Sequence, residues 1–155
     1  MKIGEALQER AAAHKLLADV RERIGAYAVH DEDETPAEHA TALLAEANQL
    51  ADRLGDLVGR INATNSATGF PGGGTVTDAL ARRDALSAKI TTLEGALRHV
   101  VNGRERAWRA SGPEVRRTVA IDVTVVRAQL EAVSAERRRL DAQLQRLSWE
   151  VDLLD

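Results

Sequence analysis

The chain has 155 residues, the size of one ordinary domain. Hydrophobic residues make up 44% and charged residues 29% of it, which excludes both a disordered chain and a membrane protein built from long apolar spans. There is no cysteine, so disulfides, thiolate nucleophiles, zinc–thiolate sites and iron–sulfur clusters are excluded.

The first half of the chain predicts two long helices. Apolar residues at helical spacing predict the first over residues 3–27, followed by the acidic segment HDEDETPAE at 30–38, which is typical of a solvated loop. A second helix is predicted over 36–63. Its apolar residues alternate four and three positions apart, as in antiparallel bundles and coiled coils: Leu43, Ala47, Leu50, Leu54, Leu57 and Ile61.

The second half predicts two more helices with an irregular segment between them. Turn-forming residues at 62–78 precede a third helix over 77–101. Residues 104–121 break the helical period, and their alternating valines predict a short β-hairpin insertion. A fourth helix, over 122–152 with Asp122 as its cap, carries a seam of four heptads interrupted by Arg137. We therefore expect a single all-α domain over 1–155, with four long helices in an antiparallel bundle or coiled-coil-like arrangement.

Polar residues at the turn between the second and third helices form the candidate ligand site. A helical hairpin would bring the end of one helix close to the start of the next, where amides, carboxylates and arginines can bind an anion or another polar ligand. The alternative is a set of helix caps and ion pairs that fixes the hairpin. The residues are Asn62 and Asn65 before the turn, and Asp78, Arg82, Arg83 and Asp84 after it.

Other motifs do not predict chemistry. Gly72–Gly74 lack the lysine of a phosphate-binding loop, and the acidic segment has neither EF-hand nor HExxH spacing, so no cofactor and no metal are expected. No catalytic motif is visible, which leaves open whether the protein is an enzyme. The start, MKIGEALQERAAAHK, is charged where a signal peptide is apolar, which predicts a cytoplasmic protein with no membrane partner.

Six arginines lie between residues 98 and 117, with two glutamates and Trp108 among them. Arginine beside an aromatic ring suits nucleic acid, and it equally suits the acidic segment of a neighbouring subunit. The net charge of −3 favours the second interpretation.

The end of the chain predicts self-association. Trp149 and Leu153 lie two residues off the apolar seam of the fourth helix, so this end is apolar on two faces. One face can be buried within the chain, and the other needs a partner. We therefore expect a homo-oligomer whose interface includes Trp149, Leu153 and Trp108.

Several segments together resemble a family of bacterial proteins labelled septicolysin-like: MKIGEALQERA at the start, INATN at 61–65, TVTDALARRDAL at 75–86, and the order of helices around them. The resemblance covers nearly the full length. It implies an all-helical fold with a short β insertion and supplies no catalytic residues; the label implies a pore-forming toxin, although the chain has no export signal and no amphipathic membrane strands.

Together these observations predict an oligomeric structural or interaction protein. The alternative is a small-ligand or phosphate-binding protein, or an enzyme, that uses the polar cluster between the second and third helices.

Overall fold

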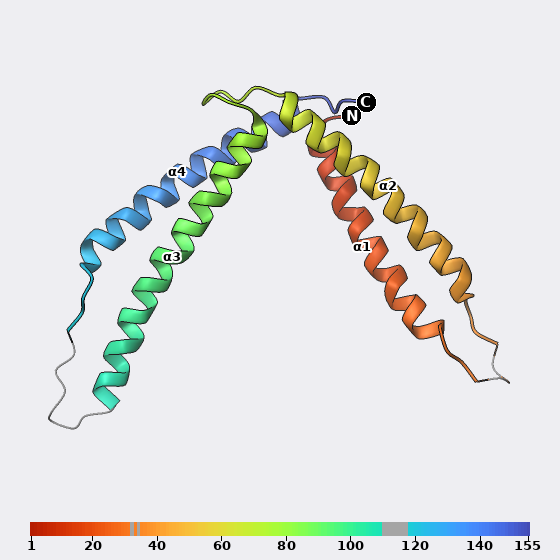
Figure 1. The fold of residues 1–155 in the computed structure, drawn as a ribbon, viewed down its shortest axis with the longest axis horizontal. Helices are drawn as coiled ribbons and strands as arrows, with labels where there is room; N and C mark the ends of the chain where they lie inside the picture. The colour runs from red at the N-terminus through yellow and green to blue at the C-terminus, as the bar shows by residue number, and fades with distance from the viewer. Residues whose placement is uncertain (32, 34, 110–117) are drawn as a thin grey trace. The chain divides into compact units, whose positions relative to one another are not determined.

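A computed structural model describes residues 1–31, 33, 35–109 and 118–155, with the backbone alone described for 104–109. It confirms an all-α protein of four long helices (Figure 1): α1 (Ile3–Tyr27), α2 (Ala40–Ala67), α3 (Val76–Arg109) and α4 (Val123–Glu150). The chain divides into two compact units. Unit 1 comprises residues 1–77 and 145–155, and unit 2 comprises residues 78–144.

The predicted β-hairpin over 104–121 is wrong wherever the structure describes it. Residues 104–109 continue α3, and residues 118–121 form no strand. The reason is local: the sequence RERAWR at 104–109 consists mainly of arginine, glutamate and alanine, which are strong helix formers. Residues 110–117, the rest of the predicted hairpin, lie outside the described part of the chain.

The second helix begins and ends later than the sequence predicts. Pro36 precedes it, and the carbonyl of His39 accepts hydrogen bonds from the amides of Ala42 and Leu43, at 2.9 and 3.1 Å, as α2 begins. The fourth helix starts as predicted, because Asp122 Oδ1 accepts hydrogen bonds from the amides of Thr124 and Val125, at 2.8 and 3.1 Å.

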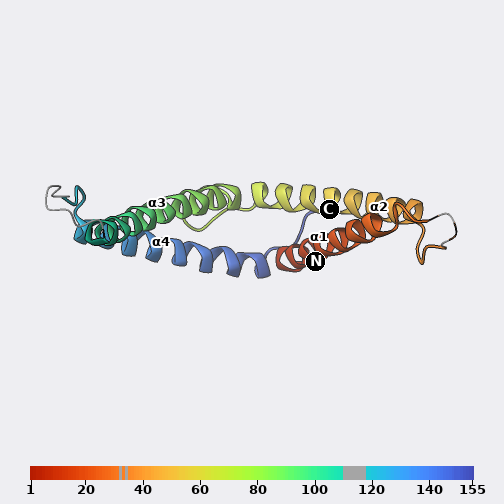
Figure 2. The same cartoon turned by 90° about the horizontal axis from the view of Figure 1, so that it is seen from below.

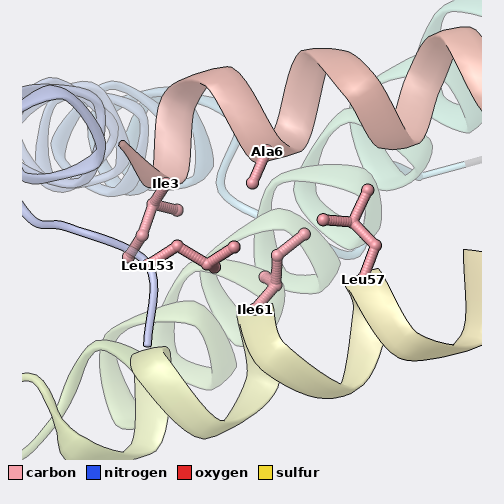
Figure 3. Close-up of a cluster of buried hydrophobic side chains, with 5 residues drawn as sticks. All are labelled: Ile3, Ala6, Leu57, Ile61 and Leu153. Atoms are coloured by element: carbon pink, nitrogen blue, oxygen red, sulfur yellow. The ribbon is translucent and has the colours of Figure 1, made fainter. Parts of the chain in front are cut away.

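Unit 1 is built on an antiparallel hairpin of α1 and α2, which lie side by side in both views (Figures 1 and 2). Near the chain termini its core also takes a residue from the segment after α4. Figure 3 shows this cluster of buried side chains: Ile3 and Ala6 from α1, Leu57 and Ile61 from α2, and Leu153. Burying each large aliphatic side chain stabilises the unit by about 1.5–3 kcal/mol.

The segment after α4 is held to the start of α1 by backbone contacts. The amide of Ile3 donates to the carbonyl of Val151 at 3.1 Å, and the amide of Leu153 donates to the carbonyl of Met1 at 2.8 Å. Lys2 adds an ion pair with Asp152, with 2.9 Å between Nζ and Oδ1. The hydrogen bond that Lys2 donates within this ion pair holds the pKa of the Asp152 carboxyl below its usual value.

The turn after α2 closes on itself. Gly69 and Thr75 form an isolated antiparallel bridge, and the amide of Gly73 donates to the carbonyl of Phe70 at 2.9 Å. Gly73 and Gly74 adopt φ values of 90° and 75°, which glycine reaches without steric cost. The glycines therefore have a structural role in the turn.

Unit 2 is a second antiparallel hairpin, formed by α3 and α4 (Figures 1 and 2). Among its described side chains, the buried apolar ones are Ala79, Leu86 and Leu140. The other apolar residues along the two seams are only half-buried: Leu80, Ile90, Leu93, Leu97 and Val100 on α3, and Val123, Val126, Leu130, Val133 and Leu144 on α4.

Candidate functional site

The residues of the predicted ligand site come from both units. Unit 1 contributes Asn62, which is exposed, and Asn65, which is buried on the last turns of α2. Unit 2 contributes the other four, on the first turns of α3: Asp78, Arg82, Arg83 and Asp84. The site that would combine the two sets stays a prediction.

Both arginines of the predicted site pair with carboxylates of unit 2. Arg82 forms an ion pair with Glu136 of α4, and Arg83 lies 3.1 Å from the carboxylate of its neighbour Asp84. These side chains are well exposed, so each pair contributes at most about 1 kcal/mol. The Arg82 pair joins α3 to α4, so it does not test whether the cluster fixes the turn between α2 and α3, and that alternative stays a prediction.

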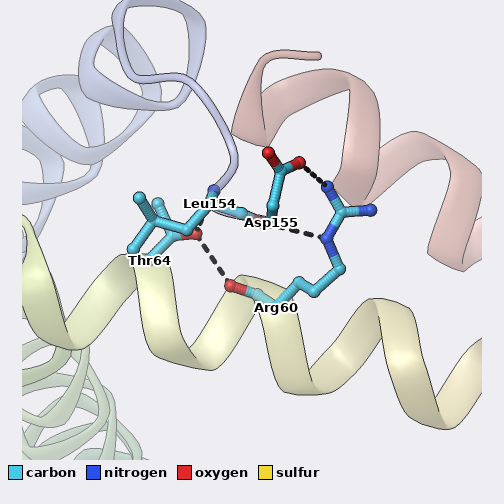
Figure 4. A network of polar contacts seen from close by, with 4 residues as sticks. All are labelled: Arg60, Thr64, Leu154 and Asp155. Atoms are coloured by element: carbon cyan, nitrogen blue, oxygen red, sulfur yellow. Dashed lines mark hydrogen bonds and ion pairs between the residues drawn. The ribbon is translucent and has the colours of Figure 1, made fainter.

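A polar network that the sequence did not reveal surrounds Thr64 (Figure 4). The Thr64 hydroxyl donates to the carbonyl of Arg60 at 2.7 Å and accepts a hydrogen bond from the amide of Leu154 at 3.0 Å. Arg60 Nε donates to the carbonyl of Leu154 at 2.9 Å, and its guanidinium lies 3.3 Å from Asp155. We call Arg60 and Thr64 the tail clamp, because together they hold residues 154–155 against α2.

Thr64 carried one signal that pointed to this role. It lies three residues after Ile61, and is therefore on the buried face of α2, where a hydroxyl group needs a partner. Thr64 is only 1% exposed in the structure. Nothing in the sequence indicated that the partner would come from ninety residues further along the chain.

The residues predicted to form an oligomer interface differ in exposure. Leu153 belongs to the core of unit 1, so the chain itself covers it and the argument that it needs a partner fails. Trp149 is 48% exposed, and its ring lies so close to Gly4 that a Cβ atom there would stand 2.9 Å from the ring. Trp108 lies among the residues whose side chains are not described.

Exposed apolar side chains gather toward the end of unit 2 at which α4 begins. Val101 of α3 is 53% exposed and Val125 of α4 is 51% exposed, while Val119 and Ile121 are exposed in the segment before α4. Together with the half-buried seams, these side chains leave apolar surface uncovered in the described part of unit 2.

The acidic segment connects α1 to α2 at the opposite end of unit 1 from the chain termini. Arg23 of α1 forms an ion pair with Glu38, and this hydrogen bond lowers the pKa of the Glu38 carboxyl. Asp31 and Asp33 are exposed, and Val29 beside them is 87% exposed. Within the described residues, no group of three or more histidine and carboxylate side chains is placed to hold a metal ion.

Two polar side chains of the helices, His14 and Arg137, lie in different surroundings. His14 is exposed on α1. Arg137 lies on the seam of α4 with its Nε buried and 3.6 Å from Asp141, too far for a hydrogen bond. None of the helices in the described residues is long and apolar enough to cross a membrane.

Comparisons with known proteins identify relatives of unknown function. In a crystal structure, a functionally unknown conserved protein from Corynebacterium diphtheriae has the same fold, with a TM-score of 0.90 and 34% sequence identity over 99% of each chain. No curated protein matches the chain. Neither finding bears on the septicolysin-like resemblance, which stays a prediction. The model of a family of unknown function, DUF6847, matches residues 10–153, and the chain therefore belongs to that family.

Proposed function

We propose that the protein is a helical assembly module, which binds further copies of itself through unit 2. The observation that carries this proposal is the incomplete burial of the α3 and α4 seams. Apart from Ala79, Leu86 and Leu140, the apolar seam residues described there are half-buried or exposed. A pair of helices leaves the outer part of each apolar stripe in water unless another layer covers it.

The sequence of α4 fits such a layer. Its seam repeats with heptad spacing, which lets a helix from another chain insert side chains between its own. Arg137 interrupts this seam, with its Nε buried but its side chain 43% exposed. A polar residue within a seam selects register or subunit number, because mispaired arrangements leave it without a partner. Arg137 would therefore favour one register and subunit number over the others that the apolar seam residues alone would allow.

Sedimentation equilibrium of the full chain tests the proposal. We expect a weight-average mass that rises with concentration through the micromolar range, and a weaker association in Val125→Lys, which places a charge on an exposed apolar position. Thr124→Lys is the matched control, because it adds the same charge one residue away at an exposed polar position. Both variants should keep the helical circular dichroism of the parent. A parent chain that stays monomeric throughout this range would contradict the proposal.

A further inference from the structure

We infer that α4 pairs with α4 of a second copy in an antiparallel arrangement, about a twofold axis close to Ser134. The inference rests on the proposed self-association of unit 2, and it adds the surface that pairs and the orientation of the two chains. We call the α4 strip those residues of α4 up to residue 144 that lie within about 60° of Ser134 around the helix axis. Its charged residues are Arg127, Glu131, Arg137, Arg138 and Asp141.

The α4 strip is open to a partner because α3 lies against another side of the helix. Leu140 is buried, and Glu136 forms an ion pair with Arg82 of α3. Both residues lie more than about 100° around α4 from Ser134. Every residue of the α4 strip, by contrast, is exposed or half-buried.

The charges of the α4 strip have opposite signs at equal distances from Ser134. Glu131 and Arg137 lie three residues before and after it, and Arg127 and Asp141 lie seven residues before and after it. In an antiparallel pair with Ser134 at the centre, each of these residues lies level with its opposite charge in the second copy. The twofold axis repeats both contacts, as in any isologous interface. An in-register parallel pair would instead place each charge level with the same charge, which disfavours that arrangement.

The chain itself leaves these charges incompletely satisfied. Arg137 Nε is buried and lies 3.6 Å from Asp141, too far for a hydrogen bond, while the side chain as a whole is 43% exposed. The outer nitrogen atoms of its guanidinium can therefore accept a further carboxylate as partner. Among the residues that the structure describes, no ion pair involves Arg127 or Glu131. A second copy would supply a partner to all three side chains.

Two apolar residues, Val123 and Leu130, also belong to the α4 strip, and both are half-buried. Arg138 would lie level with Leu130 of the second copy, where its methylene groups can cover the leucine while its charge stays in water. A contact that combines a little apolar surface with exposed ion pairs is weak, which agrees with association in the micromolar range.

This contact is separate from the surface that Val125→Lys tests. Val125 precedes Ser134 by nine residues, which places it about 180° away around the helix. A failure of the α4 strip to pair is therefore distinguishable from a failure of unit 2 to associate at all.

Reciprocal charge reversal tests the pairing, by sedimentation equilibrium of full-length chains at low salt. Glu131→Arg alone places two arginines at each contact, and Arg137→Glu alone places two glutamates there. We expect each variant to associate at least about tenfold more weakly than the parent, because symmetry applies the change twice and each exposed pair contributes a factor of about five at most. An equimolar mixture should form one-to-one pairs with the affinity of the parent, since each contact then joins an arginine to a glutamate.

The controls separate this pairing from general effects of charge and folding. The chain that carries both changes should associate as the parent does, which also shows that neither change prevents folding. Glu22→Arg on α1 and Arg139→Glu, which lies about 140° from Ser134, make the same charge changes at exposed positions outside the α4 strip. Each of these should associate as the parent does. Both single variants of the α4 strip keep a negative net charge, so attraction between whole chains does not explain recovery in their mixture.

Cross-linking locates the twofold axis independently. The chain has no cysteine, so Ser134→Cys provides a single thiol, which should lie beside the same thiol of the second copy. A bismaleimide cross-linker should then join the chains in pairs. Ala132→Cys is the matched control, because this exposed position lies on the opposite side of α4, and it should give few linked pairs.

Three results would overturn the inference. If neither charge variant weakens an association that does occur, the proposed function stands and the α4 strip is not the contact. If both variants weaken it but neither their mixture nor the chain with both changes restores it, Glu131 and Arg137 do not face each other across the pair. If the parent chain is monomeric at every concentration, both the inference and the proposed function fail.

Discussion

Replacing Thr64 with valine tests whether the tail clamp holds the end of the chain. Valine keeps the shape and the β-branching of threonine but removes the hydroxyl, so the amide of Leu154 loses its acceptor. An unsatisfied buried donor costs about 1–3 kcal/mol. We expect the lower part of that range, about 1–2 kcal/mol, because Leu154 is 47% exposed and water can replace part of the lost bond. The melting temperature should fall by about 2–8 °C.

Amide hydrogen exchange gives the decisive local measurement, because it reports opening of the tail separately from unfolding of each unit. The amide of Leu153, which donates to Met1, should exchange faster in Thr64→Val than in the parent. Thr68→Val is the matched control: its hydroxyl, at the C-cap of α2, donates to the carbonyl of Thr64, one turn earlier, at 2.8 Å. Equal tail exchange in the parent and both variants would refute the clamp.

Three further predictions concern the same end of unit 1. Leu153→Ala should cost about 2–4 kcal/mol in thermal or chemical unfolding because it empties a core position, whereas Leu154→Ala, at an exposed position, should change stability by less than about 0.5 kcal/mol. Gly4→Ala should displace the ring of Trp149, because the added Cβ would stand too close to it. The displacement should appear as a red shift of the Trp149 fluorescence, measured in a Trp108→Phe background. In a Trp149→Ala chain, which lacks the ring, Gly4→Ala should cause no loss of stability. The carboxyl of Asp152 should titrate by NMR below its usual pKa, so its stabilising ion pair is complete above about pH 4 and is lost as the pH falls through the lower folded-state value.

The helices were predictable from sequence because each carries its own periodic signal. Examples are the alternating four- and three-residue spacing from Leu43 to Ile61 and the heptads of α4. These patterns are local, so they can be recognised without knowledge of any long-range contact. The boundaries of α1 and the start of α4, where Asp122 forms a cap, were predicted closely, whereas α2 lies four residues later than its pattern predicts. Valines beyond the end of α3 suggested strand alternation, yet the Arg-Glu-Ala sequence before them was a helix signal in its own right and extended α3 to Arg109.

The environment of the chain end was not predictable in the same way. Leu153 lies after α4, so its helical position relative to Trp149 does not describe where its side chain goes. Backbone bonds from Val151 and Leu153 to the first residues of the chain turn this segment into the core between α1 and α2. A periodicity argument assumes that the helix continues. It gave a wrong position for Leu153 because α4 ends before that residue, at Glu150.

The two hairpins differ in how completely their apolar residues are covered, and this difference bears on function. Unit 1 gains a third element, the segment after α4, which fills the gap between α1 and α2 and buries Ile3, Ile61 and Leu153 together. Among the described residues of unit 2, no comparable third element contributes to the seam of α3 and α4. A pair of helices needs a third element to cover its apolar stripes, and unit 1 has one. The same requirement predicts that unit 2 lacks a covering layer, and another copy of the chain can supply it.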